Sequence, residues 1–344
     1  MVLAAGFGTR LRPLTLSVPK PLLPVAGAAV TAYTLRRLEQ AGCEVAAMNL
    51  HYLGEAVEEH FGDRFGDLPL VYSQETEILG TLGALSKLHH LWSGADLVVV
   101  ANGDSLCRWP VQKLVRRHLK SGAAATLLVS NRADTQRYGG GIGIDEEDNV
   151  VSFRPGEDRQ AANRRAVFAG LHVFSPRLIE DLAQRPADFV KDLYDPLLDQ
   201  GEKVLAVPTT RDWHDLGTPR RYLDAVLDWV RGRRARRWLP GRRALISDAA
   251  QISAEAEVAD SAIEAGVRIE AGSSLDGCLV LPGAHIGAGS HLRDVIIGFD
   301  TVIAPETFIE RRMVTRRTAG YAEAPYASIL GDLVYSPLDP PPSA

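Results

Sequence analysis

Two cationic side chains lie near the amino terminus of this 344-residue chain, each beside residues that shape the backbone. Arg10 belongs to a glycine-rich stretch that follows a short apolar run, and Lys20 stands between two prolines. Successive backbone N–H groups of a glycine-rich turn can bind phosphate oxygens. A guanidinium can hold a polyphosphate through paired hydrogen bonds, whereas an ammonium acts as a point charge. The stretch therefore predicts a binding site for a polyphosphate.

This glycine stretch differs from better known phosphate-binding motifs. No Lys-Ser or Lys-Thr pair closes the glycine spacing as a P-loop requires, and Leu11 stands where a dinucleotide-binding fingerprint has its third glycine. Ser17 and Lys20 have the Ser-x-x-Lys spacing of penicillin-recognising enzymes. The prolines around Lys20 disfavour the helical turn which that pair needs. We therefore expect an anion site whose fixed charge comes from the two cations.

Two aspartates could hold a metal ion beside that anion. Asp104 follows the apolar run 98–101, and Asp215 precedes a Leu-Gly-Thr-Pro turn. Magnesium in proteins is held by one or two carboxylates, while substrate phosphates and water complete its oxygen ligands. The pair therefore predicts an Mg²⁺ site, in which His214 is either a third ligand or an outer, surface residue.

Strand-like apolar runs alternate with amphipathic, helix-like stretches up to about residue 228. The strand-like runs are 2–5, 45–49, 70–72, 97–101, 124–129, 167–174 and 204–207, and the clearest helix-like stretches are 28–41 and 109–121. This alternation is typical of an α/β protein with a mostly parallel sheet and helices on both faces. Such sheets bind ligands beyond the carboxyl ends of their strands, so the functional residues are expected there.

A hexapeptide repeat follows residue 244. Aliphatic residues recur mostly at intervals of six, at Ile246, Ile252, Val258, Ile263, Ile269, Leu275, Leu281, Ile297, Ile303 and Ile309. One inward aliphatic residue per six is typical of a parallel β-helix whose triangular coils each use about three hexads. The sequence therefore predicts a site-bearing domain at 1–228, an arginine-rich linker at 229–244, a small β-helix at 245–312 and a loose tail at 313–344.

Composition excludes several classes of protein. With 46% hydrophobic and 24% charged residues, the chain is neither disordered nor fibrous, and no apolar run approaches the roughly 18 residues of a membrane span. The net charge of -5 argues against a protein that coats nucleic acid, and we interpret the seven arginines between 231 and 243 as a solvated connector. Three distant cysteines offer no disulfide framework. We expect a cytoplasmic protein without nucleic-acid or membrane partners.

These motifs appear in the order found in sugar-1-phosphate nucleotidylyltransferases, and the chain resembles that family over residues 1 to about 312. The resemblance rests on the N-terminal stretch, Leu79-Gly80-Thr81, Asn102-Gly103-Asp104, Phe168-Ala169-Gly170 and the turn after Asp215. The chain looks like the branch with a C-terminal left-handed β-helix, similar to mannose-1-phosphate guanylyltransferases. The resemblance implies a Rossmann-like, mostly parallel sheet of the nucleotide-diphospho-sugar transferase type, followed by that β-helix.

The resemblance also implies roles for individual residues. Nucleotide binding is implied for Leu3, Ala4, Ala5, Gly6, Gly8, Thr9, Arg10, Glu75, Gly80, Thr81 and Gly103. Sugar-phosphate binding is implied for Lys20, Gly141 and Gly170, with Arg154 or Lys191 replacing a family lysine that this chain lacks after its central strand. Asp104 and Asp215 would hold Mg²⁺ and would form the catalytic set together with Arg10 and Lys20. The β-helix is expected to join copies of the chain into a homo-oligomer.

The implied reaction transfers a nucleoside monophosphate from an NTP to a sugar 1-phosphate, with release of pyrophosphate. The sugar phosphate oxygen is already a nucleophile at neutral pH, so no general base is needed. The protein must instead supply alignment and neutralisation of charge.

Glu75 favours GTP among the nucleotides. Guanine offers N1–H and a 2-amino group side by side to a carboxylate, whereas uracil and thymine offer one imide N–H. Gln74, beside Glu75, leaves dTTP and UTP as alternative nucleotides. Phe168 leaves the muramic acid phosphate uridylyltransferases as an alternative activity. Mannose 1-phosphate as the sugar substrate is implied only by the family resemblance. Two other classes are alternatives: a non-catalytic regulatory subunit of the same fold, and an acyltransferase that uses His285 or His291.

Overall fold

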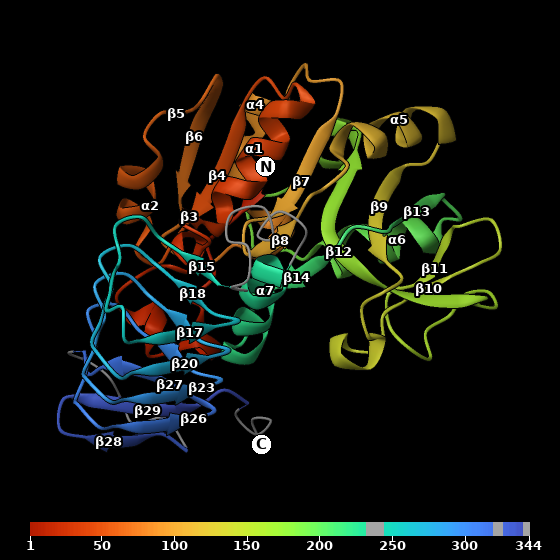
Figure 1. Cartoon of the computed structure of the whole chain (residues 1–344). Helices are drawn as coiled ribbons and strands as arrows, with labels where there is room; N and C mark the ends of the chain where they lie inside the picture. The colour runs from red at the N-terminus through yellow and green to blue at the C-terminus, as the bar shows by residue number, and fades with distance from the viewer. Residues whose placement is uncertain (232–243, 319–325, 340–344) are drawn as a thin grey trace. The chain divides into compact units, whose positions relative to one another are not determined.

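A computed structural model describes residues 1–231, 244–318 and 326–339, which divide into two compact units (Figure 1). The first unit comprises Met1–Gly6 and Thr31–Trp213, and the second comprises Phe7–Val30 and the described residues from His214 onward. These units cut across the predicted domain limit at residue 228, because residues 7–30 belong with the C-terminal part of the chain. Most of the arginine-rich stretch predicted as a linker, residues 232–243, lies outside the described residues.

A mixed sheet forms the centre of the first unit. Its strands are β1 (Val2–Leu3), β4 (Ala46–Leu50), β5 (Arg64–Phe65), β6 (Leu68–Gln74), β7 (Val98–Asn102), β9 (Ala125–Ser130), β10 (Ile142–Ile144), β11 (Val150–Ser152), β12 (Arg164–Phe174) and β13 (Val204–Thr209). Their order is β11-β10-β12-β7-β1-β4-β6-β5, and β9 pairs with both β12 and β13. Strands β7, β1, β4 and β6 are mutually parallel, so their carboxyl ends lie at one edge of the sheet. The short strands β8 (Ser105–Cys107) and β14 (Trp213–Asp215) lie outside this sheet.

Helices follow the strands as the alternating sequence predicts. They are α1 (Val30–Ala41), α2 (Gly54–Phe61), α3 (Gly80–Gly83), α4 (His89–Trp92), α5 (Val111–Ser121), α6 (Asp195–Asp199) and α7 (Pro219–Arg231). Shorter helical turns are η1 (Thr9–Leu11), η2 (Leu14–Leu16), η3 (Lys20–Leu22), η4 (Ser86–Leu88), η5 (Thr135–Tyr138), η6 (Pro176–Ile179) and η7 (Val190–Tyr194). Helix α5 buries Val111, Leu114 and His118, whose spacing of three and four places them on one face. It ends at Ser121 and is followed by Gly122, whose φ of 65° is the left-handed conformation common after a helix.

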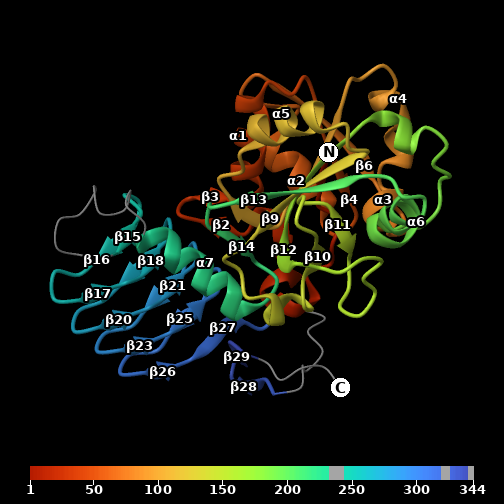
Figure 2. The ribbon, with the colours of Figure 1, turned by 90° about the vertical axis from the view of Figure 1, so that its right-hand side faces the viewer.

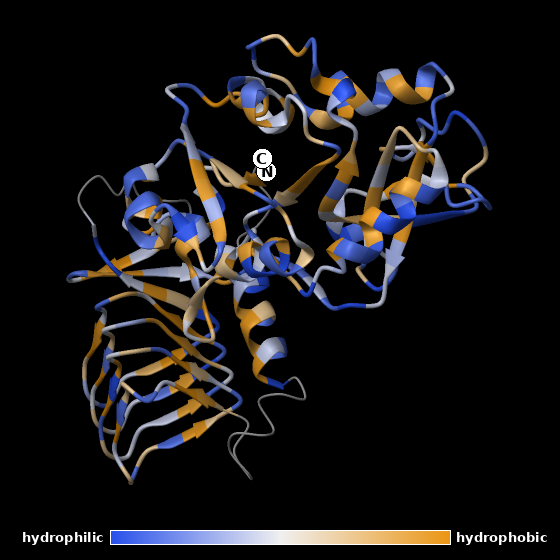
Figure 3. Cartoon of the chain, turned by 90° about the horizontal axis from the view of Figure 1, so that it is seen from above, coloured by the Kyte–Doolittle hydropathy of each residue, from blue (hydrophilic) through white to orange (hydrophobic). Residues whose placement is uncertain are grey.

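A parallel solenoid forms most of the second unit. The first of its three sheets contains β15 (Leu245–Ile246), β18 (Ala262–Ile263), β21 (Leu279–Val280), β24 (Ile296–Ile297) and β27 (Arg312–Arg316). The second contains β16 (Gln251–Ile252), β19 (Arg268–Ile269), β22 (His285–Ile286) and β25 (Val302–Ile303). The third contains β17 (Glu257–Ala259), β20 (Ser274–Asp276), β23 (His291–Arg293) and β26 (Phe308–Glu310). Both residues of β18, β21 and β24 are hydrophobic and buried, whereas β19 and β22 each pair a polar residue with a buried isoleucine, and both colours occur along the solenoid (Figure 3).

The repeat length of the solenoid differs in detail from the predicted hexads. Ile263 pairs with Val280, and Val280 pairs with Ile297, so one coil is 17 residues long, with steps of six, six and five. Val280 belongs to the core cluster, and it takes the inward position that the sequence analysis gave to Leu281. The predicted inward position is therefore wrong by one residue there, because Val280 and Leu281 are both aliphatic and both buried.

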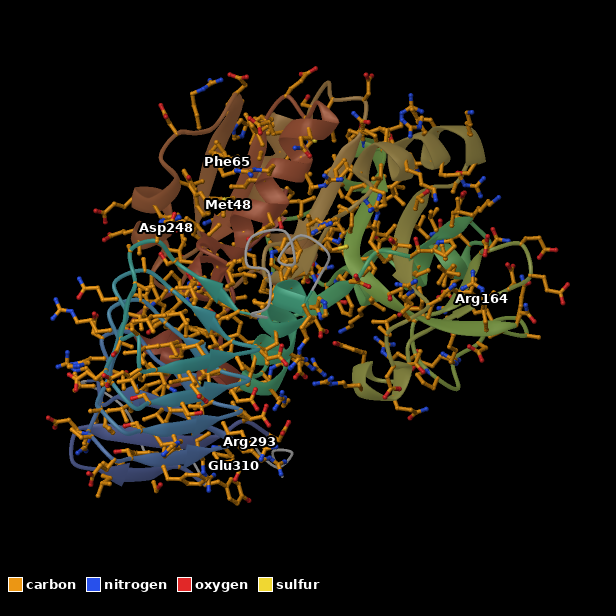
Figure 4. The ribbon with its side chains drawn as sticks, viewed as in Figure 1. Met48, Phe65, Arg164, Asp248, Arg293 and Glu310 are labelled. Atoms are coloured by element: carbon orange, nitrogen blue, oxygen red, sulfur yellow. The ribbon has the colours of Figure 1, made fainter. Side chains whose placement is uncertain are left out.

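The part of the tail that the structure describes is ordered as strands. β27 continues the first sheet of the solenoid, and β28 (Ser328–Leu330) and β29 (Leu333–Pro337) add to it as antiparallel strands. The prediction of a loose tail from residue 313 is therefore wrong for these strands, because the hexad period ends there while strand pairing continues. On the outer surface of consecutive coils, Arg293 and Glu310 form an ion pair at 4.0 Å (Figure 4).

Helix α7 and a short hairpin complete the second unit. α7 contacts β18 and β21 and lies along the solenoid (Figure 2). The hairpin pairs β2 (Pro24–Val25) with β3 (Ala28–Ala29). None of the helices that the structure describes has the length and apolarity to span a bilayer.

Candidate active site

The glycine stretch after β1 is fixed by its own backbone conformation. Gly8 has a φ of 61°, and a Cβ there would lie 3.0 Å from the Thr15 side chain. The buried Thr15 hydroxyl donates a hydrogen bond of 2.8 Å to the Gly8 carbonyl. Glycine is therefore required at position 8 for both conformation and space. At Gly6 a Cβ would meet nothing within 4 Å, so this position leaves open space beside the backbone.

Lys20 is held in the turn η3 with its side chain mostly buried. Pro19 precedes the turn in an extended conformation, and the Leu23 N–H donates to the Lys20 carbonyl at 3.1 Å. Lys20 is 8% exposed, and its Nζ lies 3.8 Å from Oδ1 of Asp215. The cation and the carboxylate, 195 positions apart in the sequence, are thus neighbours within the second unit.

Asp215 is surrounded by cations. The Arg221 guanidinium donates to its Oδ2 at 2.6 Å, and Lys20 lies at the other oxygen. A Cβ on Gly217 would lie 2.8 Å from Asp215 Oδ2 and 3.1 Å from the Arg10 guanidinium, so both groups approach this glycine. Three positive charges around one negative charge leave a local excess of positive charge. The arrangement is suited to a polyanion.

Arg221 was missed by the sequence analysis. It lies on α7, which begins at Pro219 directly after the Asp215 turn, and its side chain reaches back to Asp215. The sequence signal that could have indicated Arg221 is its position on a helix, six residues after an aspartate that ends a strand. His214, weighed as a third metal ligand, has its Nδ1 4.0 Å from an oxygen of Asp228.

Asp104 follows the carboxyl end of β7 in the first unit. The preceding Gly103 donates its N–H to the Leu3 carbonyl at 2.9 Å and accepts a 2.8 Å hydrogen bond from the Thr31 hydroxyl. A Cβ on Gly103 would lie 2.9 Å from the Leu3 oxygen, so only glycine permits this close approach to β1. Gly170, with a φ of 70°, lies against the side chain of Asn102. Strands β7, β1 and β12 therefore fix the position of Asp104.

Glu75 is buried and accepts hydrogen bonds from two internal donors. It is 4% exposed, and its Oε1 accepts from the Asn49 amide at 2.9 Å while its Oε2 accepts from the Leu79 N–H at 2.9 Å. Asn49 in turn accepts from the Ala4 N–H at 3.0 Å. Each oxygen of this buried carboxylate accepts one internal hydrogen bond, and the role of Glu75 in recognition of the base stays a prediction. Asn49 was not predicted, although it is a polar residue near the carboxyl end of an apolar strand.

The Gly80 turn is packed against a second loop of the same unit. Gly80 has a φ of 74°, and a Cβ on it would lie 2.6 Å from the Ala187 carbonyl oxygen. The Thr81 hydroxyl donates to Asp188 at 3.0 Å, and the Lys191 N–H donates to the same carboxylate at 3.2 Å. Asp188 therefore connects the turn that contains Thr81 to the turn that contains Lys191.

The remaining sugar-phosphate candidates have different surroundings. Arg154 donates to Glu157 at 2.8 Å and lies 3.6 Å from Asp195, and its side chain is half-exposed, so its role in binding the sugar phosphate stays a prediction. Lys191 is exposed on η7. Gly141, with a φ of 72°, lies against the Ala166 carbonyl and accepts from Arg165 at 3.1 Å.

The Gly80→Ala variant is expected to weaken NTP binding, with a rise in KM of about tenfold, because the added methyl group must displace the Ala187 backbone and shift the turn. Gly94→Ala is the matched control: Gly94 has a φ of 88°, but a Cβ on it would meet nothing within 4 Å. Steady-state kinetics measure both values. An equal KM for the two variants would contradict a role of the turn in NTP binding.

The sheet with its helices and the solenoid together define an α/β protein extended by hexapeptide repeats. The chain belongs to the Nucleotidyl transferase family, which matches residues 1–231. A GlmU-like C-terminal hexapeptide family matches residues 235–315. The family and the fold class expected from the motifs are thus confirmed.

The chain is similar to several proteins of known name. It is 30% identical over 230 residues to mannose-1-phosphate guanylyltransferase catalytic subunit beta of Drosophila pseudoobscura pseudoobscura. The matched region covers 66% of this chain and 61% of that protein. It is 33% identical over 235 residues to mannose-1-phosphate guanylyltransferase of Mycobacterium tuberculosis. That matched region covers 67% of this chain and 64% of that protein. The match thus spans less than two thirds of the length of either protein.

Solved structures share the fold over 66% of the chain. The crystal structure of HddC from Yersinia pseudotuberculosis has a TM-score of 0.55 and 23% identity and covers 66% of this chain and 97% of that chain. A second structure of HddC, complexed with GMP-PN, has the same TM-score and coverage and 25% identity.

Proposed function

We propose that the protein transfers a nucleoside monophosphate from an NTP to a sugar 1-phosphate and releases pyrophosphate, with GTP and mannose 1-phosphate as the substrates. The observation that carries the proposal is the grouping of Lys20, Arg221 and Arg10 near Asp215, in a chain of the Nucleotidyl transferase family. These cations suit a triphosphate and the negative charge that develops on leaving pyrophosphate.

The chain's own side chains act by binding and alignment. The attacking oxygen of a sugar 1-phosphate is a nucleophile at neutral pH, so catalysis needs in-line placement at the α-phosphorus and neutralisation of charge. Lys20 is suited to this because proline and burial restrict its ammonium. Arg10 and Arg221 provide guanidinium groups that match phosphate oxygens.

Asp104 and Asp215 are the proposed ligands of a divalent metal, with Mg²⁺ as the ion. Both offer only oxygen, the donor that Mg²⁺ prefers. Among the described residues, no group of three His, Cys, Asp or Glu could hold a metal ion, so substrate phosphates and water would complete the ligand set. When bound, Mg²⁺ would neutralise charge on the phosphate oxygens.

The relatives add support for guanine as the base. Proteins similar to this chain are named mannose-1-phosphate guanylyltransferases, and one similar crystal structure contains GMP-PN. Both facts support GTP, in addition to the match between a carboxylate at Glu75 and the N1–H and 2-amino group of guanine.

Pyrophosphate release across a grid of four NTPs and several sugar 1-phosphates, with Mg²⁺, tests the proposal. We expect the highest kcat/KM for GTP with mannose 1-phosphate. A higher value with dTTP or UTP would reassign the base, and no release in any combination would favour the non-catalytic subunit. Consumption of an acyl donor with an amino sugar would favour the acyltransferase, whose candidate base His285 lies 2.7 Å from Glu270.

We also propose that the solenoid joins copies of the chain. Val302 on β25 and Phe308 on β26, at the last positions of two different sheets of the solenoid, are 58% and 71% exposed, and burial of such apolar side chains against a partner is favourable.

The Phe308→Glu variant is expected to dissociate the oligomer, because a carboxylate in an apolar contact is costly to bury. Light scattering at equal concentrations measures the mass. Arg268→Glu, an exposed change on the same solenoid, is the control and is expected to keep the wild-type mass. A wild-type protein that is monomeric would contradict the proposal.

A further inference from the structure

A buried carboxylate of the solenoid holds the hairpin that follows Lys20. Glu264 lies directly after β18 and is 3% exposed. It accepts from the Gly27 N–H through Oε2 at 3.0 Å and through Oε1 at 3.3 Å, and it also bonds the Ala26 N–H. Burial raises the pKa of Glu264, while these two backbone N–H groups lower it. A carboxylate placed in this way is expensive to bury unless donors such as these satisfy it.

The turn that Glu264 holds has an unusual backbone. Ala26 and Gly27 have φ values of 53° and 81°, so two consecutive residues are left-handed. Two successive left-handed residues form a tight hairpin turn. Alanine is unfavourable in this conformation, so the surrounding structure must stabilise the turn. The Glu264 carboxylate is the group that does so, because it binds the N–H groups of both residues.

Further contacts connect this hairpin to Lys20 and Arg221, the cations beside Asp215. The Val30 N–H donates to the Leu23 carbonyl at 2.9 Å, which closes the hairpin just after η3 and Lys20. At the base of the hairpin, the Tyr222 hydroxyl donates to the Pro24 carbonyl at 2.6 Å. Tyr222 is fully buried and follows Arg221, which donates to Asp215.

We propose that Glu264 is a positioning residue through which the solenoid holds Lys20 in place for phosphate binding. Glu264 acts through the Ala26–Gly27 turn and does not itself contact substrate. The proposal rests on the proposed function for its kinetic consequence, whereas its structural consequence can be measured without any substrate. It assigns the solenoid a part in the active site of its own chain, in addition to any part in oligomer formation.

Hydrogen exchange and kinetics of the full-length Glu264→Gln variant test the proposal. Glutamine keeps the size of the side chain but replaces one acceptor oxygen by an NH2 group that faces backbone donors. We expect amide exchange in residues 19–30 to rise by about tenfold, with exchange in β7 unchanged. We also expect kcat to fall by about tenfold, while KM for the sugar phosphate changes by less than about threefold. Glu257→Gln, the same change at an exposed position of the solenoid, is the control.

The two readouts separate this proposal from the proposed function. Unchanged exchange in residues 19–30 would overturn the positioning role, whatever the activity. A rise that is equal in residues 19–30 and in β7 would also overturn it, since it would indicate general destabilisation. If the wild-type protein transfers no nucleotide, a selective rise in exchange still supports the hold of Glu264 on the hairpin.

Glu264→Asp keeps both oxygens on a shorter side chain and is expected to restore at least a third of the wild-type kcat. It also carries the exchange test, with the same criteria, if Glu264→Gln does not fold. A kcat of Glu264→Asp no higher than that of Glu264→Gln would overturn the assignment of the carboxylate as the holding group.

Discussion

The Asp104→Asn and Asp215→Asn variants are expected to lose turnover by on the order of a thousandfold or more, while each protein remains folded. An amide oxygen is a neutral and weaker ligand for Mg²⁺ than a carboxylate, so charge on the reacting phosphates would no longer be neutralised. Pyrophosphate release at saturating substrates measures the effect, and the Mg²⁺ concentration for half-maximal rate is expected to rise.

The two variants differ in a second property. Asp215→Asn also removes the negative charge beside Lys20 and Arg221, so the local excess of positive charge increases by one. We therefore expect NTP binding measured without turnover to be unchanged or tighter in Asp215→Asn. Asp96→Asn, at an exposed position of the same unit as Asp104, is the control. A near-wild-type rate for either site variant would remove that residue from the metal assignment.

The Lys20→Met variant is expected to lower kcat/KM by about a hundredfold, because a buried point charge close to the phosphates is replaced by an apolar side chain of similar length. Lys20→Arg is expected to rescue little, because the larger planar guanidinium does not fit where an ammonium is 8% exposed. Measurement of kcat/KM for both substrates tests these values.

Lys120→Met makes the same chemical change at an exposed position of α5 and is expected to leave kcat/KM unaltered. If Lys20→Met lowers only the thermal midpoint and not kcat/KM at 25 °C, the assignment of Lys20 to phosphate binding is wrong.

The fold was largely predictable because it depends on local patterns. Strand runs such as 97–101 and 124–129 correspond closely to β7 and β9, since each is apolar, is bounded by turn residues and is buried. The solenoid was predicted from its aliphatic period, but the period could not distinguish Val280 from Leu281. Hydropathy gives both residues the same weight, and only strand pairing decides which one lies inside the coil.

The site was harder to predict, because its partners are distant in the sequence. A strand-end aspartate and a Pro-Lys-Pro segment are visible at positions 215 and 20, but their approach to 3.8 Å depends on the fold. Arg221 and Asn49 are ordinary residues of a helix and a strand until their contacts with Asp215 and Glu75 are known. The surroundings of Glu75 have partly the same origin, since the Asn49 amide comes from another strand, whereas its second donor, the Leu79 N–H, is local.

The membership of residues 7–30 in the second unit bears on how this protein could be recombined with others. A boundary drawn at residue 231 looks like a natural place to exchange C-terminal modules, since the two family matches meet there. However, the Ala26–Gly27 turn donates its N–H groups to a side chain beyond that boundary. A chimera that receives a foreign solenoid must therefore inherit an acceptor at the position of Glu264 or exchange the hairpin together with the solenoid. The segments that must be exchanged together, the hairpin and the solenoid, are therefore separated in the sequence, although each family match is a continuous range.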